Sequence, residues 1–576
     1  MMGYMISPPA PELPQSKLVD LVRDCVIGDD VVMPGPFGPR RITYADYTAS
    51  GRGLSFIEEI IQSRVLPAYA NTHTESSGTG LQTTRLREEA RQIIHQALGA
   101  DDDYVVIFAG SGCTGAIDRL IGILNLRIPA DLDERHNLSQ HIPTESRPVI
   151  FIGPYEHHSN ELPWRECIAD VVTIDETPEG HIDPVSLRSA LERYADRSLK
   201  IGAFSAASNV TGILTDCDGI SRLLHEYGAL AIWDYAAAGP YVNVRTAAPT
   251  GDPLAAKDAV VLSPHKFIGG PGTPGVLVLH RDLLANRVPA VVGGGTVRFV
   301  NPTDHEYLSD PIEREEAGTP AIVESIRAGL VFKLKQSVGS ETIEQLEADW
   351  TRRAIATWRD HPNIRILGNL DTDRLSIVSF VVRSTNDGYL HHNFVVSVLN
   401  DLFGIQSRGG CSCAGPYGHR LLGIDLETSQ EFAREITGGC EGIKPGWIRV
   451  NFNYFLSEEI FQFIVAAVEV VATYGHRLLP QYHFDPESGL WRHEEGRADP
   501  PLSLSDVSFA NGFVRLPPDL PRAPVSALAD YLAEGTELLE SLPEPSSQGP
   551  EGLVSQDFES LRWFDLPRNS LVSPGN

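Results

Sequence analysis

Short apolar runs alternate with amphipathic stretches between about residues 41 and 300. Most of the runs are β-branched or apolar throughout, which is typical of strands buried on both faces of a parallel sheet. Intervening segments such as residues 220–227 can hold the crossover helices that a parallel sheet requires. The pattern predicts an α/β fold with strands at residues 104–108, 149–152, 201–204, 230–233, 259–262 and 276–279.

A second block, from about residue 320 to 480, has a different pattern. Helical spacing over residues 321–334 is followed by an alternating strand at 375–382 and a helix near 458–474, which predicts a smaller α+β domain. We therefore expect four parts. They are an N-terminal segment, 1–40, that packs on the small domain, a large domain, 41–319, the small domain, 320–480, and a C-terminal extension, 481–576. Within the extension, the Pro-, Ser- and Gly-rich residues 543–553 indicate a linker or flexible loop.

The charge balance narrows the choice of partners. The chain has 47 Lys and Arg against 76 Asp and Glu, a formal net charge of -29. Such a surface repels phosphate backbones and anionic lipid, so we expect no nucleic-acid or membrane partner. No apolar run approaches the roughly 20 residues of a membrane span, and residues 1–14 lack the pattern of a secretory signal. Seven cysteines in a long chain do not suggest a disulfide framework, which favours a cytoplasmic location.

Two predicted strand ends carry groups suited to binding a ligand. The strand 104–108 leads into the glycine-rich turn 109–115 and then a helical pattern, and free N–H groups at such a helix start favour phosphate. A tight turn without a ligand explains this pattern equally well. Asp234 closes the strand 230–233, at the edge where open α/β sheets bind ligands. It could hold a pyridinium nitrogen protonated, or it could simply cap a helix.

Lys266 follows the predicted strand 259–262 and precedes a glycine-rich stretch, in the sequence SPHKFIGG. Most lysines lie on solvated surfaces, but here Ser263 and His265 are neighbouring candidate phosphate ligands. A nucleophilic amine needs a lowered pKa, which burial or a nearby cation provides. His157 and His158, in the stretch PYEHHSN, follow another strand; an imidazole there could stack on a flat cofactor, although a structural role is more common.

The loop RGGCSCAGP, residues 408–416, holds two cysteines one residue apart. Cys411, Cys413 and His419 could bind zinc, but the usual spacing and a fourth ligand are both missing. A disulfide between Cys411 and Cys413 would be strained. The positive charge of Arg408 and the glycine-rich loop favour a reactive thiolate over inert cysteines.

From about Tyr44 to about Leu456, these motifs resemble, in order and spacing, the class V aminotransferase-type family of pyridoxal-phosphate enzymes. The resemblance is greatest to its cysteine desulfurase and selenocysteine lyase branch. It implies a fold-type I transferase, with a large domain built on a mainly parallel sheet and a smaller α+β domain. It also implies the cofactor pyridoxal 5'-phosphate, with the candidate ligands Cys113, Thr114, His157, Asn209, Asp234, Ser263, His265, Lys266 and Thr319.

The resemblance assigns a role to several of these ligands. Lys266 matches the Schiff-base lysine, His157 the residue that stacks on the cofactor ring, and Asp234 the acid that pairs with the ring nitrogen. Thr319, in the stretch EAGTP, matches a segment that reaches the phosphate of the neighbouring subunit, which implies a homodimer with shared sites. Cys413 stands where this branch carries its sulfur-accepting cysteine. Together with the roles given above, the resemblance therefore implies the catalytic residues Lys266, Cys413 and His157.

On the substrate side, the resemblance makes Arg449 the ligand of a small amino acid's carboxylate, together with Asn209 and Arg408. The implied reaction removes sulfur from cysteine, or a related amino acid, through an external aldimine and a persulfide on Cys413. A sulfur-acceptor protein is then a candidate partner, and no metal is implied.

Departures from the family pattern leave other hypotheses open. Ala237 stands where a glutamine is common, and the Cys411–Cys413 pair resembles molybdenum-cofactor sulfurases more than the usual His-His-Cys. The residues after 481 have no counterpart in compact members. One alternative is a pyridoxal-phosphate-dependent C–S lyase, selenocysteine lyase, epimerase or aminotransferase without a persulfide step. Another is a catalytically silent binding protein, although the intact lysine, aspartate and arginine argue against it.

Overall fold

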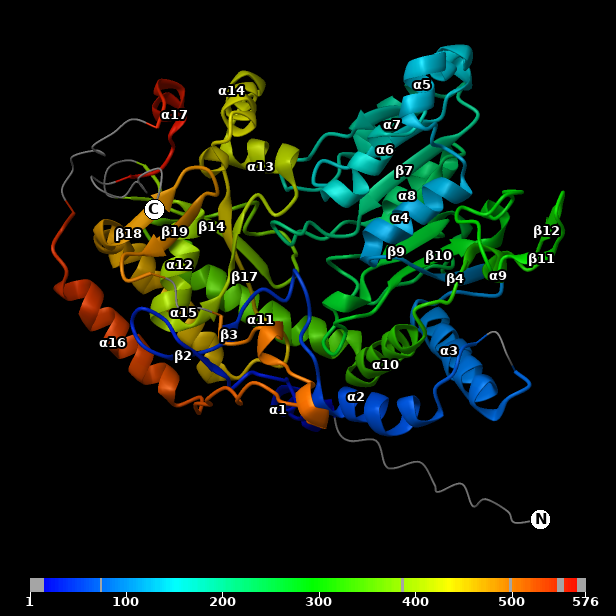
Figure 1. Cartoon of the computed structure of the whole chain (residues 1–576). Helices are drawn as coiled ribbons and strands as arrows, with labels where there is room; N and C mark the ends of the chain where they lie inside the picture. The colour runs from blue at the N-terminus through cyan, green and yellow to red at the C-terminus, as the bar shows by residue number, and fades with distance from the viewer. Residues whose placement is uncertain (1–14, 73–74, 385–387, 497–499, 546–553, 567–576) are drawn as a thin grey trace.

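The computed structural model describes residues 15–72, 75–384, 388–496, 500–545 and 554–566, and its largest element is a seven-stranded sheet (Figure 1). In spatial order the strands are β4 (Tyr104–Ala109), β10 (Gly275–His280), β9 (Ala259–Leu262), β8 (Leu230–Asp234), β7 (Lys200–Ser205), β5 (Val149–Ile152) and β6 (Asp170–Thr173). Strand β10 runs antiparallel to β9 and β4, and the other pairs are parallel. The predicted α/β fold with a mainly parallel sheet is confirmed. The hydrophobic pattern missed β6, a partly exposed edge strand.

Both faces of this large sheet are buried, as its apolar strands require. Along β4, Val106 and Phe108 join one hydrophobic core, whereas Val105 and Ile107 join another, because side chains alternate between the faces of a strand. Helix α4 (Gly112–Ile123), which follows β4, contributes to the second core. The large sheet is thus covered on both sides by apolar packing.

Two long helices pack closely beside the large sheet. Helix α3 (Gly78–Ala97) lies against α10 (Ile322–Val338), the helix predicted at residues 321–334. A Cβ atom at Gly329 of α10 would lie 2.5 Å from the Cβ of Ala90, so glycine allows the two helices to approach. Because α3 also packs against β4, this contact joins α10 to the large sheet.

A second, antiparallel sheet has four strands. In spatial order they are β13 (Ile364–Ile366), β14 (Ile377–Val382), β17 (Trp447–Asn451) and β16 (Arg408–Gly410). The helices that share its core are α11 (Ser340–Trp358), α12 (His392–Phe403) and α15 (Glu458–Tyr474). The strand and helix predicted at 375–382 and 458–474 are therefore present as β14 and α15.

Helix α15 is the most apolar long helix of the described chain. Together with the turn that follows, Glu458–Gln481 is long and apolar enough to cross a membrane by length and composition alone. However, 61% of its most apolar window is buried inside the protein, where Phe463 and Ile464 belong to the core beneath the small sheet. That placement is typical of the core helix of a globular fold.

The described end segments of the chain pack on both sheets. In the N-terminal part, α1 (Gln15–Asp24) contributes to the core of the large sheet, and the guanidinium of Arg40 donates to the carbonyl of Leu402 at 2.8 Å. In the C-terminal part, α16 (Ala527–Ser541) and α17 (Gln556–Leu561) join the core of the small sheet. The division at residues 40, 319 and 480 stays a prediction, and most of the predicted linker, residues 546–553, lies outside the described residues.

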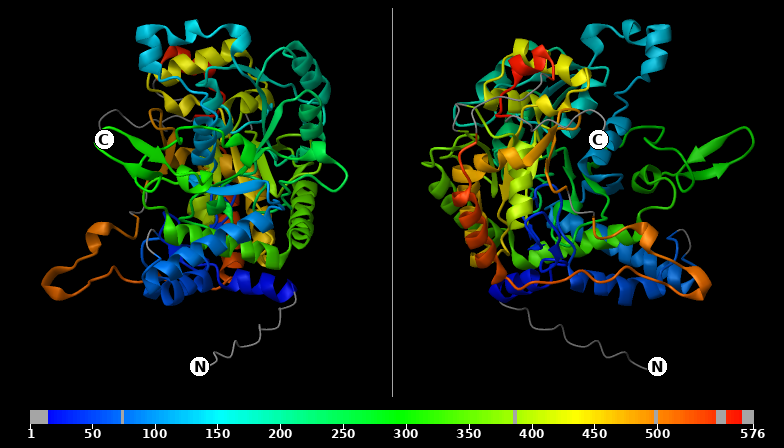
Figure 2. Two further views of the ribbon diagram at one scale, coloured as in Figure 1. Left: turned by 90° about the vertical axis from the view of Figure 1, so that its right-hand side faces the viewer. Right: turned by 60° about the vertical axis from the view of Figure 1, so that its left-hand side comes forward.

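Two segments project from the body on the same side of the molecule (Figure 2). One is the hairpin of β11 (Val297–Val300) and β12 (His305–Tyr307). The other is residues 500–520, which follow the hairpin of β18 (Tyr482–Asp485) and β19 (Leu490–His493). We call the first the β11–β12 hairpin and the second the arm.

Candidate functional site

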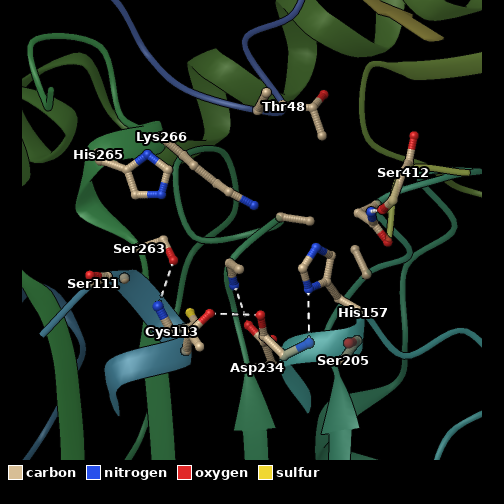
Figure 3. A pocket seen from close by; sticks show the side chains of 18 of the residues that line it. Thr48, Ser111, Cys113, His157, Ser205, Asp234, Ser263, His265, Lys266 and Ser412 are labelled. Atoms are coloured by element: carbon tan, nitrogen blue, oxygen red, sulfur yellow. Dashed lines mark hydrogen bonds between the residues drawn. The ribbon is translucent and has the colours of Figure 1, made fainter. Parts of the chain in front are cut away.

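A cavity of about 210 Å³ lies at the carboxyl edge of the large sheet, next to the small sheet (Figure 3). Parallel strands bring their carboxyl ends to one edge, so residues that end β7, β8 and β9, or follow them, meet there. Ten of the twelve predicted site residues line this cavity. They are Cys113, Thr114, His157, Asn209, Asp234, Ser263, His265, Lys266, Arg408 and Arg449. The other two, Cys413 and Thr319, lie outside its lining.

The glycine-rich turn after β4 forms an anion cradle. Gly112 has φ +55°, and a Cβ atom there would lie 2.8 Å from the Ser263 hydroxyl, so a side chain would fill the space. The backbone N–H of Cys113 donates to that hydroxyl at 2.8 Å, at the start of α4. The hydroxyls of Thr114 and Ser159 are 2.7 Å apart on the cavity wall. This helix N-terminus, with hydroxyls around it, suits a phosphate.

Lys266 reaches into the cavity from the turn after β9 (Figure 3). Burial lowers the pKa of its amine, and the positive charges of Arg449 and Arg408 act in the same direction, against Cys113 and Asp234. Burial also raises the pKa of Asp234, which accepts a hydrogen bond from the backbone N–H of Ala236 at 2.7 Å. The pair therefore offers a buried amine with a lowered pKa and a buried carboxyl group in the same cavity.

His157 presents a neutral imidazole to the cavity. Its Nδ1 accepts a hydrogen bond from the backbone N–H of Ser159 at 3.1 Å, which places the ring proton on Nε2. Burial, with the positive charge of Lys266, lowers the pKa of His157 to about 3. The ring can thus stack on a flat ligand without adding charge.

Glu156 fixes the backbone at His157. Its buried carboxylate accepts hydrogen bonds from the backbone N–H groups of Gly153 and Ser205, at 3.2 and 2.9 Å. It also accepts from the hydroxyl of Ser205 and the amide of Asn160, at 2.6 and 2.7 Å. Burial raises the pKa of Glu156 to about 7. This network joins the loop after β5 to the end of β7.

The small sheet supplies the cationic end of the cavity. Arg408 of β16 pairs in register with Arg449 of β17, so the two arginine side chains leave the sheet from neighbouring positions. Arg449 is 3% exposed, donates to Asp46 at 2.8 Å and to the carbonyl of Asn209 at 3.0 Å, and its Nε is buried without a partner. Asp46 also lies 3.9 Å from Arg408. The arrangement can receive a carboxylate.

The loop with Cys413 docks against this site. Ser412 and Cys413 both have left-handed backbones, with φ +50° and +56°. The backbone N–H of His158 donates to the carbonyl of Cys413 at 2.8 Å, and Nε2 of His158 accepts from the N–H of Gly415 at 3.1 Å. The amide of Asn209 donates to the carbonyl of Ser412 at 2.8 Å. Three hydrogen bonds thus hold the loop beside the cavity.

In the described residues, no group of three His, Cys, Asp or Glu side chains is arranged to bind a metal, so the zinc hypothesis for this loop gains no support.

Thr319 lies on an exposed segment, where its hydroxyl accepts from the amide of Asn71 at 3.3 Å. The segment is anchored by Glu316, whose carboxylate pairs with Arg87 at 2.6 Å and with Arg91 at 3.0 Å. Burial acts to raise the pKa of Glu316, but the two guanidiniums prevail and lower it to about 2. Thr319 is therefore held on the surface, away from this chain's own cavity.

The lining fits pyridoxal phosphate. Besides the cradle at Gly112, Oδ1 of Asn209 and Oγ1 of Thr48 are buried without a partner at the cavity. A buried polar atom without a partner carries a free-energy penalty, which a polar ligand would remove. The anion cradle, the amine of Lys266 and the carboxyl of Asp234 match the phosphate, aldehyde and ring nitrogen of that cofactor.

Three important residues had no assigned role in the sequence analysis. Asp46 lies two residues after Tyr44, where the resemblance to the family begins, and no pattern in the sequence marks it as a partner of the arginines. Glu156 and His158 flank His157, but their hydrogen bonds join segments far apart in the chain. Spacing along the sequence carries no trace of these contacts.

Comparisons with known proteins agree with this geometry. The profile of the aminotransferase class-V family matches residues 43–434. A probable cysteine desulfurase of Pyrococcus abyssi is 26% identical over 66% of this chain and 87% of its own length, and one of Streptomyces coelicolor is 26% identical over 68% and 88%. The apo structure of a cysteine desulfurase from Thermococcus onnurineus NA1 has a TM-score of 0.60, at 23% identity, over 75% of this chain and 95% of that one. That structure bears out the fold. Both the fold and the family expected from the sequence are thus confirmed, and with them an enzyme: the chain belongs to the aminotransferase class-V family.

Proposed function

We propose that this protein is a pyridoxal-phosphate enzyme that takes sulfur from cysteine, or a close relative, onto Cys413. The observation that carries the proposal is the docked loop. His158 and Asn209 hold the backbone of Ser412 and Cys413 beside a cavity that contains Lys266 and Arg449. The relatives from Pyrococcus abyssi and Streptomyces coelicolor are named probable cysteine desulfurases, which supports the same reaction class.

The cofactor would be held by residues of the large sheet. The cradle at Gly112 and Cys113, with Thr114, Ser263 and His265, would bind the phosphate, and His157 would stack on the ring. When bound, pyridoxal phosphate supplies an electron sink for charge that develops on the substrate's α-carbon. Asp234 would keep its ring nitrogen protonated.

The chain's own groups would carry out the remaining work. Arg449 binds the substrate carboxylate, with Asn209 and Arg408 beside it. Lys266, with its lowered pKa, accepts the α-proton. The Cys413 thiolate attacks the substrate sulfur, so that an S–S bond forms as the C–S bond breaks and the bonding electron pair remains with the β-carbon. The β-carbon takes up the proton that the Cys413 thiol gave up, and Lys266 returns a proton to the α-carbon. Alanine and a Cys413 persulfide result, and a thiol of an acceptor protein would take the sulfur.

A homodimer completes the proposal. Thr319 lies away from its own cavity, on a segment fixed by Glu316. In the family that this chain resembles, such a segment reaches the phosphate in the neighbouring subunit. The exposed hydroxyl of Thr319 is available for that contact.

One observation favours a second candidate function. Cys413 does not line the cavity, although Ser412 does. A C–S lyase, selenocysteine lyase, epimerase or aminotransferase would need no thiol at the reacting atoms. Such an enzyme would use the same lysine, aspartate and arginine.

Product analysis separates the two candidates. The wild type, Cys413→Ala and the control Cys411→Ala are each given cysteine, cystine and selenocysteine, and alanine, sulfide and selenide are measured. The proposal predicts that Cys413→Ala loses alanine formation from cysteine, while Cys411→Ala retains it. Full turnover of cysteine by Cys413→Ala would favour the thiol-independent enzyme.

A further inference from the structure

The arm carries a dense set of exposed apolar side chains. Their exposed fractions are 92% for Leu504, 75% for Phe509, 77% for Phe513, 66% for Val514 and 69% for Leu516. None of the described side chains of residues 500–520 is buried. Single exposed apolar residues are ordinary, but a contiguous set on one short segment marks an interaction site.

The residues that follow the arm are attached to the N-terminal part of the chain, which fixes the point from which the arm projects. Beyond its end, the N–H of Val32 donates to the carbonyl of Pro521 at 2.8 Å, and Arg522 pairs with Asp30 at 2.9 Å. Along the arm, Ser508 and Arg515 form an antiparallel bridge with each other. The arm is therefore a short looped structure that stands on an anchored base.

The β11–β12 hairpin has the same character and projects on the same side (Figure 2). Around it, Val291, Val292, Phe299 and Val300 are 47%, 58%, 56% and 60% exposed. Both projections carry almost no net charge. Residues 286–308 hold two arginines and two acids, and the arm holds one arginine and two acids, in a chain of net charge -29. They are the places where two such acidic molecules can approach without strong repulsion.

We propose that the arm docks on a second copy of this chain and extends the homodimer interface. A two-fold interface uses the same patch on both subunits, so if this face forms the interface, both projections meet the partner. The β11–β12 hairpin leads through residues 308–318 to Thr319, so this face is continuous with the segment already proposed to serve the neighbouring subunit. The arm lies outside residues 43–434, which match the family. The inference rests on the proposed homodimer but not on the sulfur chemistry.

The dissociation constant of the dimer tests the inference. The wild type, the double variant Phe509→Ser with Phe513→Ser, and the control Leu426→Ser are compared by analytical ultracentrifugation over a range of concentrations. Leu426 is a fair control because it is 74% exposed and starts α14 (Leu426–Thr437), a helix distant from the arm in Figure 1. Because each dimer would lose four buried phenylalanine rings, we expect the double variant to dissociate at least about 100-fold more easily than the wild type, and the control to show no change.

Two results would overturn the inference in different ways. If the double variant forms dimers with the wild-type constant, the arm is not part of the interface, and the homodimer stands. If the wild type is a monomer at every concentration, the homodimer and the arm contact both fail.

A cross-linking experiment identifies the docking partner directly. A benzoylphenylalanine is placed at position 513 of the full-length chain. Isotopically heavy and light chains are mixed, diluted until the dimers exchange subunits, and concentrated again before illumination. Docking on a second copy predicts cross-linked peptide pairs that combine heavy and light isotopes. Pairs of a single isotope only would mean that the arm folds back on its own chain, which contradicts the inference.

Discussion

Replacement of His158 by alanine tests whether the docked loop controls access of Cys413 to the substrate. In the wild type, the Nε2 atom of His158 accepts from the N–H of Gly415, while the backbone N–H of His158 holds the carbonyl of Cys413. Alanine keeps the backbone contact and removes the side-chain acceptor. The N–H of Gly415 then loses its partner, and the loop loses one of three hydrogen bonds.

The size of the effect follows from the loop's geometry. The left-handed backbones of Ser412 and Cys413 cost about 1 kcal/mol each, and the three hydrogen bonds return about 1 kcal/mol each. The docked state is therefore favoured by about 1 kcal/mol. An unpaired amide costs about 2 kcal/mol, so in His158→Ala the docked fraction falls from roughly five-sixths to roughly one-sixth. Sulfur transfer to Cys413 should slow about fivefold.

The assay is single-turnover formation of the Cys413 persulfide from cysteine, followed by mass spectrometry. His158→Gln is the matched control, because its side-chain oxygen can accept from Gly415 in place of Nε2. We expect His158→Gln to recover most of the lost rate, with the cofactor absorbance unchanged in both variants. A wild-type rate in His158→Ala would refute the reasoning about the loop.

Three further predictions concern the cradle, the ring-binding acid and the Thr319 segment. Gly112→Ala places a Cβ 2.8 Å from the Ser263 hydroxyl at φ +55°, so we expect cofactor affinity, measured by absorbance titration, to fall about tenfold. Asp234→Asn cannot keep the ring nitrogen charged, and kcat for alanine formation should drop at least about 100-fold while the protein still binds the cofactor. Glu316→Gln leaves Arg87 and Arg91 without their shared carboxylate and should lower the free energy of unfolding in urea by about 3 kcal/mol near pH 7. The pKa of Glu316, about 2, lies below its unfolded value, so its contribution to stability is complete above about pH 4.3 and fades below that pH. The difference in free energy of unfolding between wild type and Glu316→Gln should therefore be smaller by about 1 kcal/mol at pH 3.5 than near pH 7. A difference in free energy of unfolding that stays the same between pH 7 and pH 3.5 would contradict a low pKa for Glu316.

The sequence predicted the parts of the fold that local pattern encodes. All six expected strands of the large sheet are present, because uninterrupted apolar runs leave few alternatives to a buried strand. Strand β6 was missed because its edge position lets polar residues stand in it. The antiparallel direction of β10 could not be predicted, since a short apolar run looks the same in either direction.

The site was predicted in composition but not in its contacts. Ten of the expected residues share one cavity because the strand ends that carry them converge. The pairing of Arg408 with Arg449 depends on the register of two strands. The contacts of Asp46 with both arginines join segments some 400 residues apart in the chain. The apolar character of the arm is visible in the sequence, but its exposure is a property of the folded chain. The cytoplasmic location stays a prediction.

The most direct test of the central claim is the mass of the Cys413 peptide after the holoenzyme meets cysteine. The proposed function predicts that this peptide, and not the neighbouring Cys411 thiol, gains one sulfur atom while one alanine is released for each site. It also predicts that Cys413→Ser neither gains sulfur nor releases alanine. Release of alanine from cysteine by Cys413→Ser at the wild-type rate would show that the sulfur leaves without Cys413, and the claim would be wrong.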